Sequence, residues 1–261
     1  MLNSIAIDMH THSLYSGHAY STFEEMADYV RNTGLKGFCL TDHSPRGGAM
    51  DAYIPLTFRE MPRDFEGIRV YYGMEVDILD YNGNLNIIHP LEQLLDFGIF
   101  GFHDNQIEPG HSITECTQAV LAVFENPSFD LLAHPCRRGY PLDTSSIVDA
   151  ARKYNKLIEL NENCLIRLGT DRGWYVEILE ECRRKNVRIA VNSDAHFSRN
   201  IGRVCNSIKL LNEISFPEEL VINTTVEKVE KYMEERERRF VGGRYNVDFS
   251  WETERKEKMN L

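Results

Sequence analysis

Seven short apolar segments, separated by stretches with helical spacing, constrain the fold of this chain most. Several of them show no alternation of apolar and polar residues, as is typical of strands that are buried on both faces. Strands of that kind form parallel sheets covered by helices, so repeated strand–helix units predict an α/β fold. The segments are 4–8, 37–41, 70–75, 98–102, 129–133, 157–161 and 187–193.

The stretches between these segments carry helix signals. The stretch 22–32 has apolar residues at helical spacing and is followed by a glycine that can end a helix. The stretch 112–125 opens on the pattern S-I-T-E, which is typical of a capping box. Further helices are expected over 144–154, 171–185, 201–213 and, as a charged amphipathic helix, 224–240.

The chain has the length of one barrel. Its 261 residues are many for an ordinary domain but normal for a (β/α) barrel, and the strand count together with the site described below predicts a ring of seven strands. We therefore expect one barrel domain over 1–241, followed by a polar C-terminal tail over 242–261. The polar stretch 44–69 is expected to form an extended loop between a strand and its helix.

Side chains that commonly bind metals come at or just after the end of nearly every apolar segment. In a parallel barrel the carboxyl ends of the strands form one rim, so residues far apart in the sequence converge there. His10 and His12 are two residues apart, as are Asp194 and His196, which places each pair on one side of a continuing strand. The set is His10, His12, His43, Glu75, His103, His134, Asp194 and His196.

This set predicts a metal cluster. Borderline-soft ions such as zinc accept imidazole and carboxylate ligands together. The ligands are too many for one tetrahedral ion, so they favour two or three ions with a carboxylate bridge. For any single strand-end histidine a structural role is about as frequent as a metal, and His89 and His111, which fall off the pattern, are interpreted as ordinary residues. The set as a whole favours the metal interpretation.

The motifs that carry these ligands resemble those of the PHP (polymerase and histidinol phosphatase) family. The resemblance runs in order from Asp8 to about Phe216, and GHAYST at 17–22 resembles the YcdX-type bacterial phosphatases. That stretch singles out His18, which brings seven of the nine histidines onto the pattern. The other matching stretches are DMHTHS at 8–13, LTDHS at 40–44, GMEVD at 73–77, GFH at 101–103, AHP at 133–135 and SDAH at 193–196.

The resemblance implies a distorted (β/α)7 TIM-like barrel with a trinuclear metal centre. Zinc is the expected ion, with Mn²⁺ or Fe²⁺ as alternatives, and the expected reaction is hydrolysis of a phosphate monoester by a metal-bridging hydroxide. Glu75, Asp194 and His196 are the expected catalytic residues. Carried over onto this sequence, the family pattern assigns one ion to His10, His12, Glu75 and Asp194, a second to Glu75, His103 and His134, and a third to His18, His43 and His196.

Five further residues are weaker candidates for the site. Asp8 and Asp42 could orient imidazoles, although a role as a helix cap or loop carboxylate is equally frequent. Asn161 ends a strand at the same rim and could bond a metal-bound water or tie a loop. Arg137 and Arg167 could bind phosphate bidentately, although solvated surface charge is the commoner role for any one arginine.

Substrate identity stays open at this level. Histidinol phosphate is one candidate, while GHAYST favours the other branch of the family. The chain also departs from the family pattern at Asn192, where glycine is frequent, and in the segments 136–142 and 44–69. We expect the partner to be a small phosphorylated molecule.

Charge and cysteine usage bear on the remaining alternatives. The net charge of −11 disfavours a broad nucleic-acid surface and thereby a phosphodiesterase or nuclease of the same family, as does the lack of a polymerase-sized extension. A non-catalytic metal-binding module is disfavoured because all nine ligand positions are filled. Six cysteines without a C-x-x-C pair, together with no signal-like or membrane-length segment, predict a cytoplasmic protein.

Overall fold

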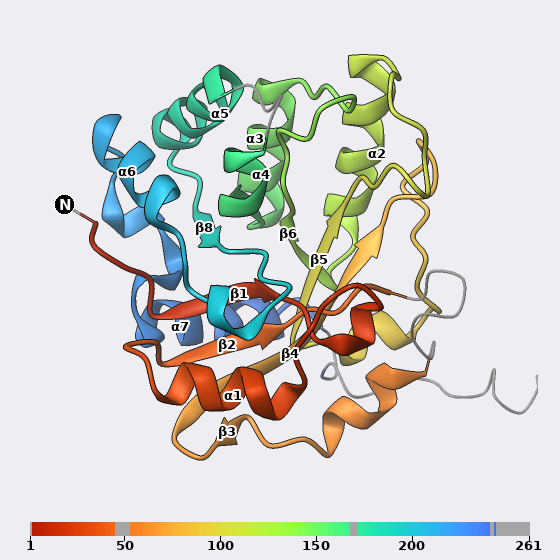
Figure 1. The fold of residues 1–261 in the computed structure, drawn as a ribbon. Helices are drawn as coiled ribbons and strands as arrows, with labels where there is room; N and C mark the ends of the chain where they lie inside the picture. Colours follow the sequence, from red (N-terminus) through yellow and green to blue (C-terminus); the bar gives the residue numbers. More distant parts are fainter. Residues whose placement is uncertain (1, 45–52, 168–171, 241–242, 244–261) are drawn as a thin grey trace, which may run out of the picture.

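Seven parallel strands form a nearly closed ring in the computed structural model, which describes residues 2–44, 53–167, 172–240 and 243 (Figure 1). Each strand pairs with the next in the order β1–β2–β4–β5–β6–β7–β8, with helices outside the ring. This architecture confirms the predicted (β/α)7 TIM-like barrel. The strands are β1 (Ile7–Thr11), β2 (Gly37–Leu40), β4 (Ile68–Asp77), β5 (Phe97–Gly101), β6 (Phe129–Leu132), β7 (Leu157–Asn161) and β8 (Ile189–Asn192).

All of the α-helices below except the short α4 lie where the sequence predicts them, with shifts at their ends, and α4 was not predicted. Both predicted capping boxes are present, at Thr22 before α1 and at Ser112 before α2. The helix expected over 201–213 begins only at Cys205, because Gly202 has a φ of 75° and turns the chain first. The helices are α1 (Phe23–Arg31), α2 (Ile113–Glu125), α3 (Thr144–Tyr154), α4 (Glu162–Ile166), α5 (Arg172–Lys185), α6 (Cys205–Glu213) and α7 (Val226–Glu237).

Two segments differ from the sequence-based prediction, and a third lies almost entirely outside the described residues. The stretch 44–69 is not only a loop: its described part holds the 3-10 helix Ile54–Arg59 and the short strand β3 (Asp64–Phe65), which pairs antiparallel with β4. The first strand covers Ile7–Thr11 rather than 4–8, because polar residues of this strand are buried and an apolar pattern underestimates it. The tail expected over 242–261 lies outside the described residues, apart from Gly243.

The interior of the ring changes from apolar to polar along each strand. On β7, Leu157 packs inside the ring, whereas Ile158 and Leu160 pack outward against the helices. The strand period of two places Glu159 and Asn161 on the same inner face as Leu157. The floor of the barrel is therefore apolar, and the carboxyl ends of the strands offer polar side chains. The apolar floor includes Ile7, Met9, Tyr71, Phe97, Ile99, Leu131, Val229 and Tyr232.

Helix α7 closes the amino end of the barrel through a buried ion cluster. Asp130 on β6 and Arg236 on α7 are both fully buried, and Nε of Arg236 donates to Oδ2 of Asp130 at 2.7 Å. Arg239 donates to the other carboxylate oxygen at 2.7 Å. These two guanidinium groups hold the pKa of Asp130 below its usual value although burial alone would raise it. One face of the charged helix is therefore a structural contact.

The ring closes between β1 and β8 without a regular ladder. One isolated bridge joins Thr11 and Ala195. Elsewhere the buried side chain of Asn223 spans the seam: Nδ2 donates to the carbonyl of Ile7 at 2.9 Å and to that of Val191 at 2.7 Å. Oδ1 of Asn192 accepts the backbone N–H of Met9 at 3.0 Å. One backbone hydrogen bond also crosses the seam, from the N–H of His12 to the carbonyl of Ala195 at 2.9 Å. Side-chain amides thus join the two strands where a regular ladder is missing.

The cysteines form no disulfides. All six are free thiols, and only Cys205 is exposed. Burial raises the pKa of Cys39 well above its usual value, so this thiol stays protonated near neutral pH. Among the described residues, no helix combines the length and the apolar character needed to cross a bilayer.

We expect Asn223→Ala to lower the free energy of unfolding by about 3 kcal/mol, because it leaves buried backbone groups of two strands unsatisfied. Urea denaturation of the metal-free protein measures this. Asn212→Ala is the matched control, since the side chain of this asparagine bonds the backbone of Leu2, away from the seam. An equal loss in both variants would contradict the role of Asn223 in closing the ring.

Candidate metal centre

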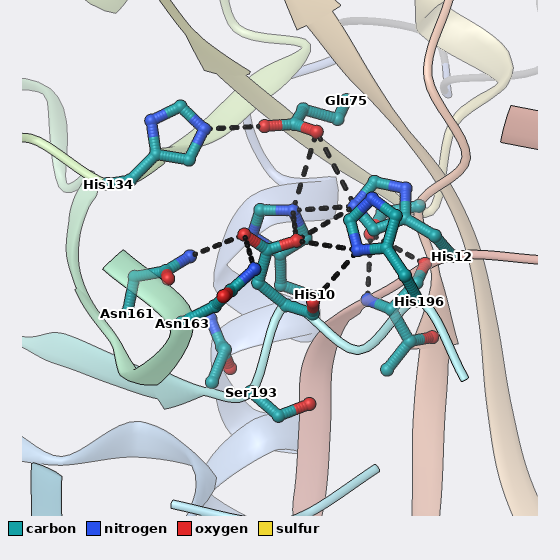
Figure 2. A network of polar contacts seen from close by, with 12 residues as sticks. His10, His12, Glu75, His134, Asn161, Asn163, Ser193 and His196 are labelled. Atoms are coloured by element: carbon teal, nitrogen blue, oxygen red, sulfur yellow. Dashed lines mark hydrogen bonds and ion pairs between the residues drawn. The ribbon is translucent and has the colours of Figure 1, made fainter. Parts of the chain in front are cut away.

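All nine predicted ligands lie together at the carboxyl ends of the strands. His10, His12 and Glu75 are at most 1% exposed, and His43, His103 and His134 are 4–6% exposed. His18, at the edge of the cluster, is exposed. Figure 2 shows His10, His12 and His196 turned toward one another with Glu75 and His134 beside them. Residues from the first and last strands meet here because the ring is closed.

Glu75 is the centre of this cluster. Its carboxylate contacts five imidazoles, and both of its oxygens take part. Oε1 lies 2.9 Å from Nε2 of His134 and 3.2 Å from Nε2 of His103. Oε2 lies 2.9 Å from Nδ1 of His43 and 3.5 Å from Nε2 of both His10 and His12. A carboxylate placed between two sets of imidazoles has the geometry of a bridging ligand.

Three groups of possible ligand atoms overlap around this carboxylate. Within each group the atoms lie no more than 4.8 Å apart. His12 belongs to two groups and so does His43, which connects the groups into one cluster. The groups are His10, His12 and Asp194; His43, Glu75 and His103; and His12, His43 and His196.

The hydrogen bonds of the imidazoles show that this cluster suits cations. Nδ1 of His18 faces the carbonyl of Ser16, and Nδ1 of His196 faces the carbonyl of Asp194, each at 3.0 Å. A carbonyl only accepts, so each Nδ1 carries the proton and each Nε2 carries a lone pair. These two Nε2 atoms lie 2.9 Å apart, where their lone pairs repel unless they share a cation.

The same arrangement occurs at the first strand. Nδ1 of His10 donates to Oε1 of Glu159 at 2.8 Å, and Nδ1 of His12 lies 3.0 Å from Oγ of Ser16. The Ser16 hydroxyl donates its own proton to Asp42 at 2.6 Å, so it accepts from His12. The two Nε2 atoms then face each other at 3.0 Å. The donor set thus fits metal ions at two places in the cluster.

The ionisation of the cluster follows from burial and mutual contact. Burial opposes the charge of Glu75, but His43, His103 and His10 hold its pKa well below the usual value. Burial would also lower the pKa of His10, yet Glu159, Glu75 and Asp194 raise it well above the usual value. The carboxylates are therefore ionised at neutral pH, as metal ligands must be.

Three residues that orient the imidazoles were not predicted from the sequence. Glu159 bonds His10, Asp77 Oδ1 lies 2.6 Å from Nδ1 of His103, and Ser16 bonds His12. A signal for Glu159 was present, because a carboxylate in the apolar run LIELN lies two residues before Asn161 and shares its inward face. Partners of this kind fix the tautomer and the direction of a ligand ring.

Asp8 and Asp42 support the site in other ways than a direct bond to a neighbouring imidazole. The carboxylate of Asp8 accepts from the backbone N–H groups of Ser193 and Gly202, at 3.2 and 2.7 Å. Burial raises its pKa to about 6, and these bonds partly offset that effect. The register of β1 shifts after Asp8, so the spacing of two does not align it with His10. Asp42 reaches His12 only through Ser16.

Asn161 lies at the rim, as the sequence predicts, and also caps α4. Its Nδ2 donates to Glu159 at 2.9 Å and lies 3.3 Å from Oδ2 of Asp194, while its Oδ1 accepts from the backbone of Cys164 at 2.7 Å. Asn163 makes a second contact with the same oxygen of Asp194 at 3.4 Å. Asn161 therefore links the two carboxylates to the start of a helix.

Two of the predicted ligands have an unusual backbone conformation. The φ angle is 31° at His134 and 55° at Asp194, a region that residues other than glycine rarely adopt. Gly101 leaves the space for the first of these rings, because a Cβ there would lie 2.7 Å from Cε1 of His134. Backbone strain of this kind gathers at functional sites, where the surrounding structure enforces it.

A cavity of about 330 Å³ opens over the cluster and is lined by both predicted arginines. Nε of Arg137 donates to Oδ1 of Asp104 at 3.1 Å, which holds this guanidinium at the wall. Arg167 follows α4 directly and lines the same cavity. The cavity therefore combines imidazoles, carboxylates and two guanidinium groups, a combination that suits a phosphate bound beside cations.

We expect Glu159→Gln to lower the affinity of the cluster for Zn²⁺ by about 10- to 100-fold, because the charge that orients His10 is lost. Competition with a chromophoric chelator measures the affinity. Glu92→Gln is the matched control, because Glu92 is also buried and bonds a histidine, His89, that is outside the cluster. Equal affinities in these two variants would show that Glu159 does not position a ligand.

Known proteins resemble this chain in sequence over most of its length. A family model described as the PHP domain matches residues 8–180. A protein of Acetivibrio thermocellus named a probable phosphatase is 40% identical over 235 residues, which are 89% of this chain and 97% of that protein. A probable phosphatase of Caldanaerobacter subterraneus is 35% identical over 242 residues, 92% of this chain and 95% of its own.

Two solved structures resemble the fold. Histidinol phosphate phosphatase from Lactococcus lactis, in complex with zinc, L-histidinol and phosphate, has a TM-score of 0.62 at 18% identity, covering 81% of this chain and 94% of that one. A chain of archaeal ribonuclease P with mature tRNA has a TM-score of 0.56 at 15% identity, covering 92% of this chain and 97% of its own. At such identities the likeness concerns the fold alone.

Proposed function

Because the chain belongs to the PHP domain family, we propose that it is a metal-dependent phosphatase that hydrolyses small phosphate monoesters. The observation that carries this proposal is the presence of two pairs of imidazoles whose Nε2 atoms face each other near a central carboxylate, below a cavity with two guanidinium groups. The relatives named probable phosphatases support the reaction class.

We assign three divalent ions to this site, with zinc first and Mn²⁺ or Fe²⁺ as alternatives. The proposed ligands are the nine residues of the family pattern, with Glu75 as the bridging carboxylate. Glu75, Asp194 and His196 are the proposed catalytic residues. When bound, such ions would lower the pKa of a water molecule and stabilise charge on the phosphoryl oxygens. The zinc named with the Lactococcus enzyme supports the choice of ion.

The other residues of the site have positioning and binding roles in this proposal. Arg137 and Arg167 bind phosphoryl oxygens from the cavity wall. Glu159, Asp77 and Ser16 hold three imidazoles in the tautomer that leaves a lone pair toward the centre. The chain itself has a net charge of −11, so attraction of an anionic ester depends on the local cations and not on the overall surface.

We expect zinc-loaded protein to release phosphate from a panel of monoesters, including histidinol phosphate and a nucleoside monophosphate, and to lose this activity on treatment with a chelator. Readdition of Zn²⁺ or Mn²⁺ should restore it. Bis(p-nitrophenyl) phosphate and single-stranded DNA test the rival diesterase. Cleavage of the diesters alone, by protein with measured metal content, would replace the monoesterase by that rival, and no cleavage at all would favour a binding role.

Ligand substitutions test the site itself. We expect His10→Ala and His196→Ala each to lower kcat/KM by at least about 100-fold while the circular dichroism spectrum stays that of a folded protein. His111→Ala is the control, since its ring contacts Tyr81 outside the cluster. Turnover that survives both ligand substitutions would mean that the active site has been placed wrongly.

A further inference from the structure

A second cavity adjoins the metal cluster on one side. Its volume is about 740 Å³, compared with about 330 Å³ for the cavity over the cluster. The two cavities share four wall residues, which are His18, Arg167, Asp194 and His196. A phosphoryl group at the cluster would therefore have the larger cavity beside it, where the rest of a substrate can lie.

Two guanidinium groups line the side cavity. Arg203 lines it from the turn before α6, and Arg167 lines it from the end of α4. Among the described residues, neither guanidinium group has a side-chain hydrogen bond or ion pair, in contrast to Arg137 with Asp104. Guanidinium groups bind carboxylates and phosphates through paired N–H donors.

The carboxylates of the same wall are already occupied. Glu162 is only 7% exposed, and both of its oxygens accept hydrogen bonds at the start of α6. Asn206 donates to Oε1 from its backbone at 3.0 Å and from its side chain at 2.7 Å, and Ser207 donates to Oε2 at 2.8 and 2.6 Å. Asp194 belongs to the metal cluster. Among the described wall residues, both carboxylates thus already have partners, which leaves the two guanidinium groups to face a substrate.

We propose that this side cavity is a subsite for a second anionic group of the substrate, a carboxylate or a further phosphate, with Arg203 as its specificity-determining residue. The inference rests on the proposed phosphatase function and narrows its substrate class. It predicts discrimination against monoesters whose leaving group is cationic, such as histidinol phosphate. Arg167, which lines both cavities, contacts the phosphoryl end and the second anion together.

Matched ester pairs test the subsite. 3-Phosphoglycerate and glycerol 3-phosphate differ by a carboxylate, and fructose 1,6-bisphosphate and fructose 6-phosphate differ by a phosphate. For the zinc-loaded protein, we expect kcat/KM to be about tenfold higher for the ester with two anionic groups in at least one pair. This is the effect of one charge-assisted hydrogen-bonded pair at a partly exposed site. The pair with the larger ratio identifies the second group.

Variants of Arg203 assign that ratio to the side cavity. Arg203→Gln should abolish the preference by raising KM for the ester with two anionic groups. The value of kcat/KM for the ester whose phosphate is its one anionic group should stay within about twofold of the original. Arg203→Lys should retain part of it. Arg199→Gln is the control, because Arg199 lies four residues earlier and outside the wall of the cavity. An equal loss for both esters would contradict the subsite.

Cys205 provides a readout that does not depend on turnover. It lines the side cavity and is the exposed thiol among six free cysteines, so iodoacetamide should modify it first. The preferred ester with two anionic groups should slow this alkylation at least about threefold more than the matched ester that lacks the second group. Arg203→Gln should remove this difference.

The two readouts separate the two proposals. Phosphate release without any preference, together with equal protection of Cys205, would overturn the subsite and leave the phosphatase intact. Selective protection without phosphate release from any ester would overturn the phosphatase and leave an anion site.

Discussion

The seam between β1 and β8 is the contact on which the site depends. His10 and His12 belong to the first strand, and Asp194 follows the last, yet Nε2 of His12 lies 3.3 Å from Oδ1 of Asp194. Asn223 and Asn192 support this approach by joining the two strands where a regular backbone ladder is missing, together with the hydrogen bond from the His12 N–H to the Ala195 carbonyl. Closure of the sheet therefore also brings the predicted ligands of the first and last strands together.

The same seam reaches the ligands through a continuous chain of hydrogen bonds. Asn192, which accepts from β1, donates from its Nδ2 to Glu159 at 2.8 Å, and Glu159 in turn orients His10. The side chain of Asn192 therefore connects the closing strand to His10, a predicted ligand. Loss of the Asn192 side chain would therefore affect both the closure of the barrel and the orientation of His10.

The charge balance of the cluster links folding with ion binding. Glu75 lies fully buried among five imidazoles, and a buried carboxylate costs free energy unless cations surround it. Burial opposes a charge on His10, but Glu159, Glu75 and Asp194 raise its pKa well above the usual value, so a proton on His10 compensates part of the charge of Glu75. Divalent ions would supply it more completely, so their binding would stabilise the closed ring.

Most of the fold could be predicted from the sequence because its signals are local. A run of apolar residues marks a strand by itself, and the capping boxes at Thr22 and Ser112 mark helix starts within four residues. The end of β1 was not predicted, because its polar residues break the apolar pattern. Burial of Asp8 and His10 depends on neighbours that are distant in sequence. The short strand β3 escaped for a similar reason: its two residues form a strand only through pairing with β4.

What the sequence by itself determined was that histidines and carboxylates lie together at the strand ends, because a parallel barrel turns such positions toward one rim. Only the tertiary structure decided which atoms meet. The imidazole of His10 bonds Glu159 and not Asp8, and Asp42 reaches His12 through Ser16. The fold also places Arg203 in the cavity beside the cluster. The physical reason is that a hydrogen bond acts over about 3 Å, and separations of that size between distant residues are set by register, a bulge and the closure of the ring.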